Sequence, residues 1–111
     1  MLASQETRDL IVLADKTVQT SRGYLVRIII EVWQLTPPQP AEFPENYKFK
    51  WHAFHLGKRS KEYIRFDNHS GKPPHYHYDE KETFFTWISL AETEKMFWQM
   101  VHQRFGDFEL D

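Results

Sequence analysis

The segment of residues 24–35, YLVRIIIEVWQL, constrains the fold of this chain more than any other. It is rich in β-branched and aromatic residues, which favour extended strands. Apolar side chains fall on both of its alternating faces, so a strand here needs cover on both sides. We therefore predict that residues 24–35 form a central strand of a sheet.

The rest of the chain predicts an antiparallel meander of about five strands that is followed by one helix. Segments with strand-like composition are separated by turn residues. The predicted strands are at about residues 9–19, 24–35, 47–56, 61–67 and 75–87, with a hairpin turn at 57–60. Residues 36–46 and 68–74 are rich in proline or turn residues, and we expect loops there because proline cannot donate to a strand ladder.

The last predicted element is a helix over residues 89–105. Ser89 precedes Glu92 by three positions, which fits a capping box. Apolar residues then recur at helical spacing as far as Phe105, and Gly106 is suited to end the helix. We expect this helix to pack on one face of the sheet, so that residues 1–111 form a single α+β domain.

The composition narrows the class of protein. The chain has no cysteine, which excludes disulfides and cysteine-based zinc sites. It has neither an apolar run long enough to cross a membrane nor the pattern of a signal peptide at residues 1–10, so we expect a cytoplasmic protein. Residues 47–78 carry seven basic and two acidic side chains and five of the six histidines. This locally basic region could attract phosphate.

Residues 65–77, RFDNHSGKPPHYH, concentrate the chemistry of the chain. Histidine gives and takes a proton near neutral pH, and two histidines two positions apart share one face of a strand. A carboxylate could orient an imidazole, and cations could hold a phosphate. The predicted catalytic residues are Asp67, His69, His75 and His77. The predicted substrate-binding residues are Arg65, Asn68, Lys72, Tyr76 and Tyr78.

Three functions are compatible with these residues. The first is metal-independent cleavage of RNA, which needs no cofactor. The second is a metal-dependent hydrolase in which a divalent transition metal is bound by His69, His75 and His77, or by His75 and His77 with Asp67 in place of His69. The third is a non-enzymatic module that binds nucleic acid or protein through the same basic patch. Asp67-Asn68 followed by Ser70-Gly71 is also ordinary turn chemistry, so the stretch could simply be a polar hairpin.

The run of residues 65–72, RFDNHSGK, followed by His75-Tyr76-His77, resembles the signature of the TumE family of small prokaryotic toxins. The resemblance extends over about residues 24–105, since the segments before and after this run occur in the expected order. Pro73-Pro74 is a departure, because more polar residues are usual there. By this resemblance, the functional positions are Asp67, Asn68, His69, His75 and His77.

The resemblance implies the toxin of a type II toxin–antitoxin pair, neutralised by a cognate antitoxin protein. RNA is the natural target for a small toxin with a basic patch, so a metal-independent endoribonuclease is the leading hypothesis. One helix can cover only one face of the strand at residues 24–35. We therefore expect a second copy of the chain, or the antitoxin, to cover the other face, which predicts a homo-oligomer or a heteromer.

Overall fold

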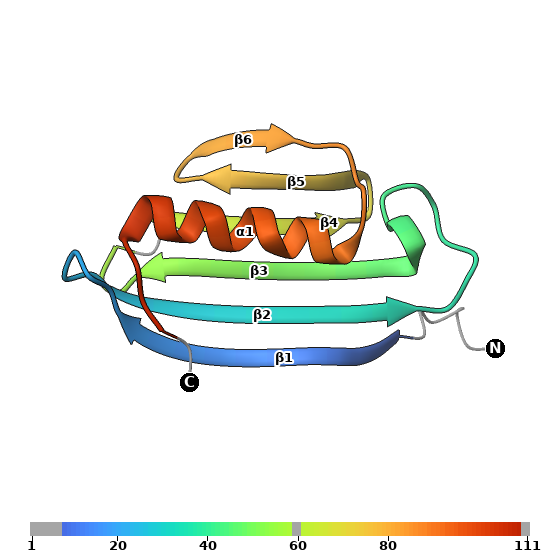
Figure 1. Cartoon of the computed structure of the whole chain (residues 1–111). Coiled ribbons are helices and arrows are strands. Elements are labelled where there is room, and N and C mark those ends of the chain that lie inside the picture. Colours follow the sequence, from blue (N-terminus) through green and yellow to red (C-terminus); the bar gives the residue numbers. More distant parts are fainter. Residues whose placement is uncertain (1–7, 59–60, 110–111) are drawn as a thin grey trace.

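The computed structural model describes residues 8–58 and 61–109. Six strands form one antiparallel sheet in which each strand pairs with the next along the chain (Figure 1). The strands are β1 (Arg8–Gln19), β2 (Leu25–Leu35), β3 (Tyr47–His55), β4 (Tyr63–His69), β5 (Lys72–Tyr78) and β6 (Lys81–Phe84). A short 3-10 helix, η1 (Pro44–Asn46), precedes β3, and the helix α1 (Leu90–Phe105) follows β6. The predicted α+β meander with a C-terminal helix is confirmed, with six strands in place of about five.

The additional strand arises because residues 75–87, which we predicted as one strand, contain a turn. Asp79 adopts a left-handed conformation with φ of 54°, which aspartate tolerates better than most residues. Its amide donates to the Tyr63 carbonyl at 2.7 Å, and its carboxylate accepts the Tyr63 amide at 3.0 Å. These two bonds hold the turn, so β5 ends at Tyr78 and a new strand begins at Lys81.

The connection between β4 and β5 is shorter than the predicted loop at residues 68–74. The two strands meet in a two-residue turn, Ser70-Gly71, where Gly71 has a φ of 79°. Pro73 and Pro74 lie inside β5, at the place where the pairing register with β4 shifts. A bulge tolerates proline because the ladder is interrupted there. Of the predicted turn at residues 57–60, residues 59–60 lie outside the described part of the chain.

Packing of α1 decides which face of the sheet is the core. The helix lies across one face of the sheet, over its middle strands (Figure 1). Phe97 of α1 is fully buried, and its ring centroid is 5.6 Å from those of both Trp51 and Phe66. The other buried apolar residues of this core are Val26, Ile28, Val32, Phe49, Ala53, Ile64, Val101 and Phe105.

Both ends of α1 are held by polar contacts. The Ser89 hydroxyl accepts the Glu92 amide at 3.1 Å, as the capping pattern predicts. At the other end, the Thr20 hydroxyl from the β1–β2 turn donates to the Phe105 carbonyl at 2.6 Å, which satisfies one of the free carbonyls at the helix terminus. Gly106 follows with a φ of 102°, and its amide donates to His102. Within the described ranges, no helix has the length and hydrophobicity that a membrane span requires.

Strand β1 lies at one edge of the sheet and pairs only with β2 among the described strands. Four consecutive apolar residues of β1, Leu10, Ile11, Val12 and Leu13, are exposed. An edge of this kind is where a further strand can add to a sheet.

We expect Phe97→Ala to lower the free energy of unfolding by about 3–5 kcal/mol, because it leaves a cavity between Trp51 and Phe66. Urea denaturation followed by tryptophan fluorescence measures this change. Ile88→Ala is the matched control, since Ile88 is 73% exposed and should cost under about 0.5 kcal/mol. Equal losses in the two variants would contradict the placement of the core.

Candidate functional site

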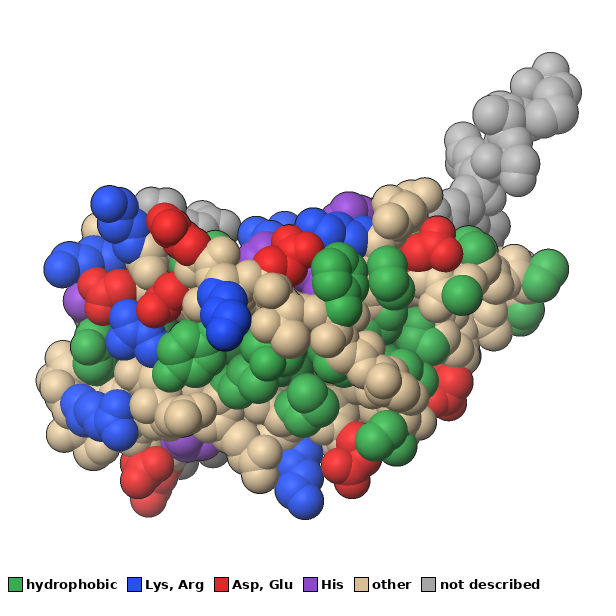
Figure 2. Space-filling model, turned by 90° about the horizontal axis from the view of Figure 1, so that it is seen from above, with side chains coloured by type: hydrophobic (Ala, Val, Ile, Leu, Met, Phe, Trp, Pro, Cys, Tyr) green, Lys and Arg blue, Asp and Glu red, His purple; other side chains and the backbone are tan. Residues whose placement is uncertain are grey.

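The open face of the sheet is the face opposite α1, and it carries a polar cluster. Side chains that alternate with the core residues point to this face. The register brings Asp67 opposite His75, Arg65 opposite His77, and His77 opposite Glu82. These five residues come from three adjacent strands. Figure 2 shows the sheet from the β6 side, with histidine, basic and acidic side chains beside one another along its upper edge.

Asp67 and His75 are the centre of the cluster. His75 Nε2 lies 2.8 Å from Asp67 Oδ1. His75 Nδ1 lies 2.9 Å from the Pro73 carbonyl; a carbonyl only accepts, so Nδ1 is the nitrogen that donates. Asp67 is 8% exposed and His75 is 1% exposed, although α1 packs on the other face. His69, at the end of β4, is exposed, with its ring centroid 6.0 Å from that of His75.

The cluster continues across β5 to β6 through alternating charges. Arg65 Nε lies 3.1 Å from Asp67 Oδ2, and Arg65 Nη2 lies 3.0 Å from His77 Nε2. Burial lowers the pKa of His77, and the Arg65 guanidinium lowers it further. At the far side, Lys72 donates to Glu82 at 2.8 Å, which lowers the pKa of that carboxyl. Both predicted phosphate-binding cations therefore already face carboxylates.

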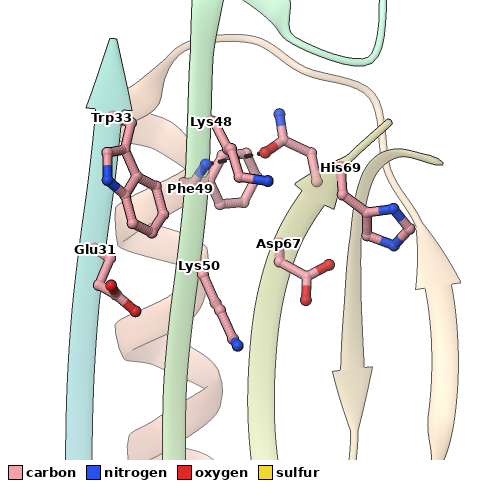
Figure 3. A pocket seen from close by; sticks show the side chains of 8 residues that line it. Glu31, Trp33, Lys48, Phe49, Lys50, Asp67 and His69 are labelled. Atoms are coloured by element: carbon pink, nitrogen blue, oxygen red, sulfur yellow. Dashed lines mark hydrogen bonds between the residues drawn. The ribbon is translucent and has the colours of Figure 1, made fainter. Parts of the chain in front are cut away.

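A hollow of about 360 Å³ adjoins this cluster (Figure 3). The side chains that line it on the open face are Glu31, Trp33, Lys48, Lys50, Asp67 and His69. Lys48 and Lys50 form no ion pair with any residue that the structure describes. These two lysines are site residues that the sequence analysis missed. Their alternation with Phe49 and Trp51 is visible in the sequence, but their position beside Asp67 depends on the register between β3 and β4.

Asn68, a predicted substrate-binding residue, forms hydrogen bonds with the backbone of the protein. It is 2% exposed, and its Oδ1 accepts the Phe49 amide at 2.9 Å. Its Nδ2 donates to the carbonyls of Glu42 at 2.8 Å and Tyr47 at 3.0 Å. The side chain therefore joins β4, opposite the bulge in β5, to the start of β3, and its polar atoms are satisfied within the protein.

Tyr76 and Tyr78 lie on the helix-covered face and not beside the histidines. Because side chains alternate along β5, a tyrosine next to a histidine in sequence points to the opposite face. Tyr76 stacks on the core residue Phe66, with ring centroids 5.2 Å apart. Both tyrosines line a separate hollow of about 310 Å³ together with Met100 of α1. A ligand on the open face cannot stack on them.

Among the residues that the structure describes, two groups of side chains could hold a metal ion. The first is Asp67, His69 and His75, and the second is His75, His77 and Glu82. In each group, one donor atom per residue lies within 4.8 Å of the other two. The predicted set of His69, His75 and His77 is not among the groups that converge within the described residues. His75 belongs to both groups because it lies between β4 and β6.

We expect Asn68→Ala to lower the free energy of unfolding by about 2–4 kcal/mol, because it leaves buried backbone groups of Phe49 and Tyr47 without their partner. Thermal or urea denaturation measures the loss. Gln39→Ala serves as control, since Gln39 makes only an exposed bond to the Thr36 carbonyl. An Asn68→Ala protein that loses no stability would show that Asn68 is available for another role.

Comparison with known proteins leaves the chain without a match. No family model, no curated protein and no solved structure matches it. The resemblance to the TumE family therefore stays a prediction. The function has to be argued from the open face and its polar cluster.

Proposed function

We propose that the open face binds and cleaves RNA, and that the chain is the toxin of a toxin–antitoxin pair. The observation that carries the proposal is the buried contact between Asp67 and His75 beside a hollow that presents two lysines without ion-pair partners among the described residues. A carboxylate beside an imidazole is a candidate acid–base pair, and lysines at the same hollow can hold an anionic substrate.

The hollow supports the binding step. Lys48 and Lys50 are two positions apart on β3 and so present two positive charges on the same face. In nucleic acids, the phosphate groups are the anions to which such lysines bind. Trp33 lies beside them (Figure 3), and an aromatic ring next to a cationic groove can stack on an unpaired base. A single-stranded RNA segment satisfies both features, since its bases are free to turn toward the protein.

The cluster supports the cleavage step. When a phosphodiester is cut, an attacking oxygen loses a proton as it bonds to phosphorus, and the leaving oxygen gains one. His69 and Asp67 line the hollow where the phosphate would lie, and the nearly inaccessible His75 lies against Asp67.

The toxin assignment adds a protein partner to this proposal. An antitoxin would restore the growth of cells that produce the chain, and Asp67→Asn would abolish the need for it. The exposed apolar run of β1 is the proposed contact surface for a partner, and light scattering after size exclusion tests whether that partner is a second copy. Growth that the wild-type chain does not slow would contradict the toxin assignment.

We expect the purified chain to degrade single-stranded RNA, and Asp67→Asn to slow the reaction by about 10²–10⁴-fold, the usual contribution of acid–base residues. Gel analysis of a labelled RNA measures the rate, once in EDTA and once with added divalent metal. His102→Ala on α1 is the control that should leave the rate unchanged. Intact RNA under both conditions, at high protein concentration, would refute cleavage and leave only a binding module.

We expect Lys48→Ala/Lys50→Ala to weaken RNA binding and to reduce the slope of log affinity against log salt by about 1.4, if each lysine contacts one phosphate of a single strand. Fluorescence anisotropy with a labelled RNA at several salt concentrations measures both quantities. Lys95→Ala, an exposed lysine of α1, removes the same type of charge from the opposite face. The same loss in the Lys95→Ala variant would mean that the attraction is general and not due to the open face.

A further inference from the structure

Three donor atoms converge at the end of β4. Asp67 and His75 face each other across the β4–β5 ladder, and His69 follows Asp67 just before the turn. One donor atom from each lies within 4.8 Å of the other two. Around a tetrahedral zinc ion with bonds of about 2.0–2.2 Å, donor atoms are about 3.4 Å apart. The three side chains therefore need only small rotations to reach one common ion.

Both histidines are held in the orientation that metal ligands adopt. His75 Nδ1 lies 2.9 Å from the Pro73 carbonyl, and His69 Nδ1 lies 3.1 Å from the Ser70 carbonyl. Because carbonyls only accept, Nδ1 is the donating nitrogen of each ring, and in the neutral form of such a ring the lone pair is on Nε2. A backbone carbonyl that holds one ring nitrogen is the usual outer contact of a metal-bound histidine. Arg65 Nε, 3.1 Å from Asp67 Oδ2, forms an ion pair with the carboxylate.

Asp67 has an unsatisfied oxygen that points to the same place. Its side chain is 11% exposed, and Oδ1 makes no hydrogen bond with any described residue. His75 Nε2 is 2.8 Å from Oδ1, but the two atoms are not arranged as a hydrogen-bonded pair. A buried carboxylate oxygen that faces a lone pair is unfavourable. A cation shared by the two atoms removes this cost.

The second group, His75, His77 and Glu82, is less suited to a metal ion. Glu82 already accepts from the Lys72 ammonium at 2.8 Å. His77 Nε2 lies 3.0 Å from a guanidinium nitrogen of Arg65. Two cations thus already occupy the donor atoms of Glu82 and His77 that a divalent ion would need.

We propose that Asp67, His69 and His75 bind one divalent transition metal ion of the zinc class. Two imidazole nitrogens and one carboxylate are the ligands that such ions take at sites with an open position. Asp67 and His69 border the hollow (Figure 3), so the open position faces Lys48 and Lys50. An ion there would polarise a phosphoryl oxygen and acidify a bound water.

The use of the ion in RNA cleavage rests on the proposed function, whereas binding of the ion does not. Zinc titration by calorimetry, on the full chain freed of metal by EDTA and dialysed, tests the binding alone. We expect one zinc ion per chain. His69→Ala should weaken binding by at least about 100-fold, given that loss of an outer contact alone costs 10–100-fold. His69 is exposed, so its removal should leave the fold intact, as circular dichroism can verify.

His102→Ala is the matched control, because it removes a histidine from α1 and should leave zinc binding unchanged. Asp67→Asn is the second test variant, since it keeps the shape of the side chain and removes its charge. Binding that is absent, or that persists in both His69→Ala and Asp67→Asn, overturns the proposal. RNA cleavage in EDTA without zinc binding overturns the metal site and leaves the proposed function. Zinc binding without cleavage of RNA leaves the metal site and overturns the proposed function.

Discussion

The packing of Phe97 against Trp51 and Phe66 is the interaction on which the rest of the structure depends. Strand side chains alternate, so once one set of β3 and β4 residues is buried under α1, the other set must lie on the open face. The side chains on the open face include Lys48, Lys50, Arg65 and Asp67. Burial of the core residues under α1 therefore brings these four together, although α1 packs on the other face. The polar cluster and the apolar core thus lie on opposite faces of the same strands.

The open face is organised by register as well as by alternation. Asp67 meets His75 because β4 and β5 are joined by a two-residue turn, and the bulge that accommodates Pro73 and Pro74 sets the pairing beyond it. Asn68, whose bonds to the backbone hold this bulge, thus supports the site without taking part in its chemistry. The two prolines stiffen the strand that carries the histidines, and the Pro73 carbonyl orients His75.

The basic residues on the open face fall into two groups, according to whether they have an ion-pair partner. Arg65 and Lys72 lie against carboxylates and balance the charge of the cluster. Lys48 and Lys50 are without ion-pair partners in the described part of the chain and line the hollow. The former pair holds the acidic and imidazole groups in place, whereas the latter is available to an anionic ligand. This division favours a ligand that approaches over β3 and reaches the ends of β4 and β5.

Strand and helix patterns, the cap at Ser89 and the stretch that holds the histidines could all be derived from the sequence, because they depend on residues close together along the chain. The turn at Asp79 could not, since it depends on bonds to Tyr63 on another strand. The roles of the individual residues within the site could not be derived from the sequence either. Tyr76 and Asn68 are near the histidines in sequence, but Tyr76 packs in the core and Asn68 forms hydrogen bonds with the backbone. Lys50 is distant in sequence, but it lies opposite Asp67. Sequence alone determined which chemical groups are present, and only the tertiary structure decided which of them meet, because strand register and the face covered by α1 are set by contacts between distant segments.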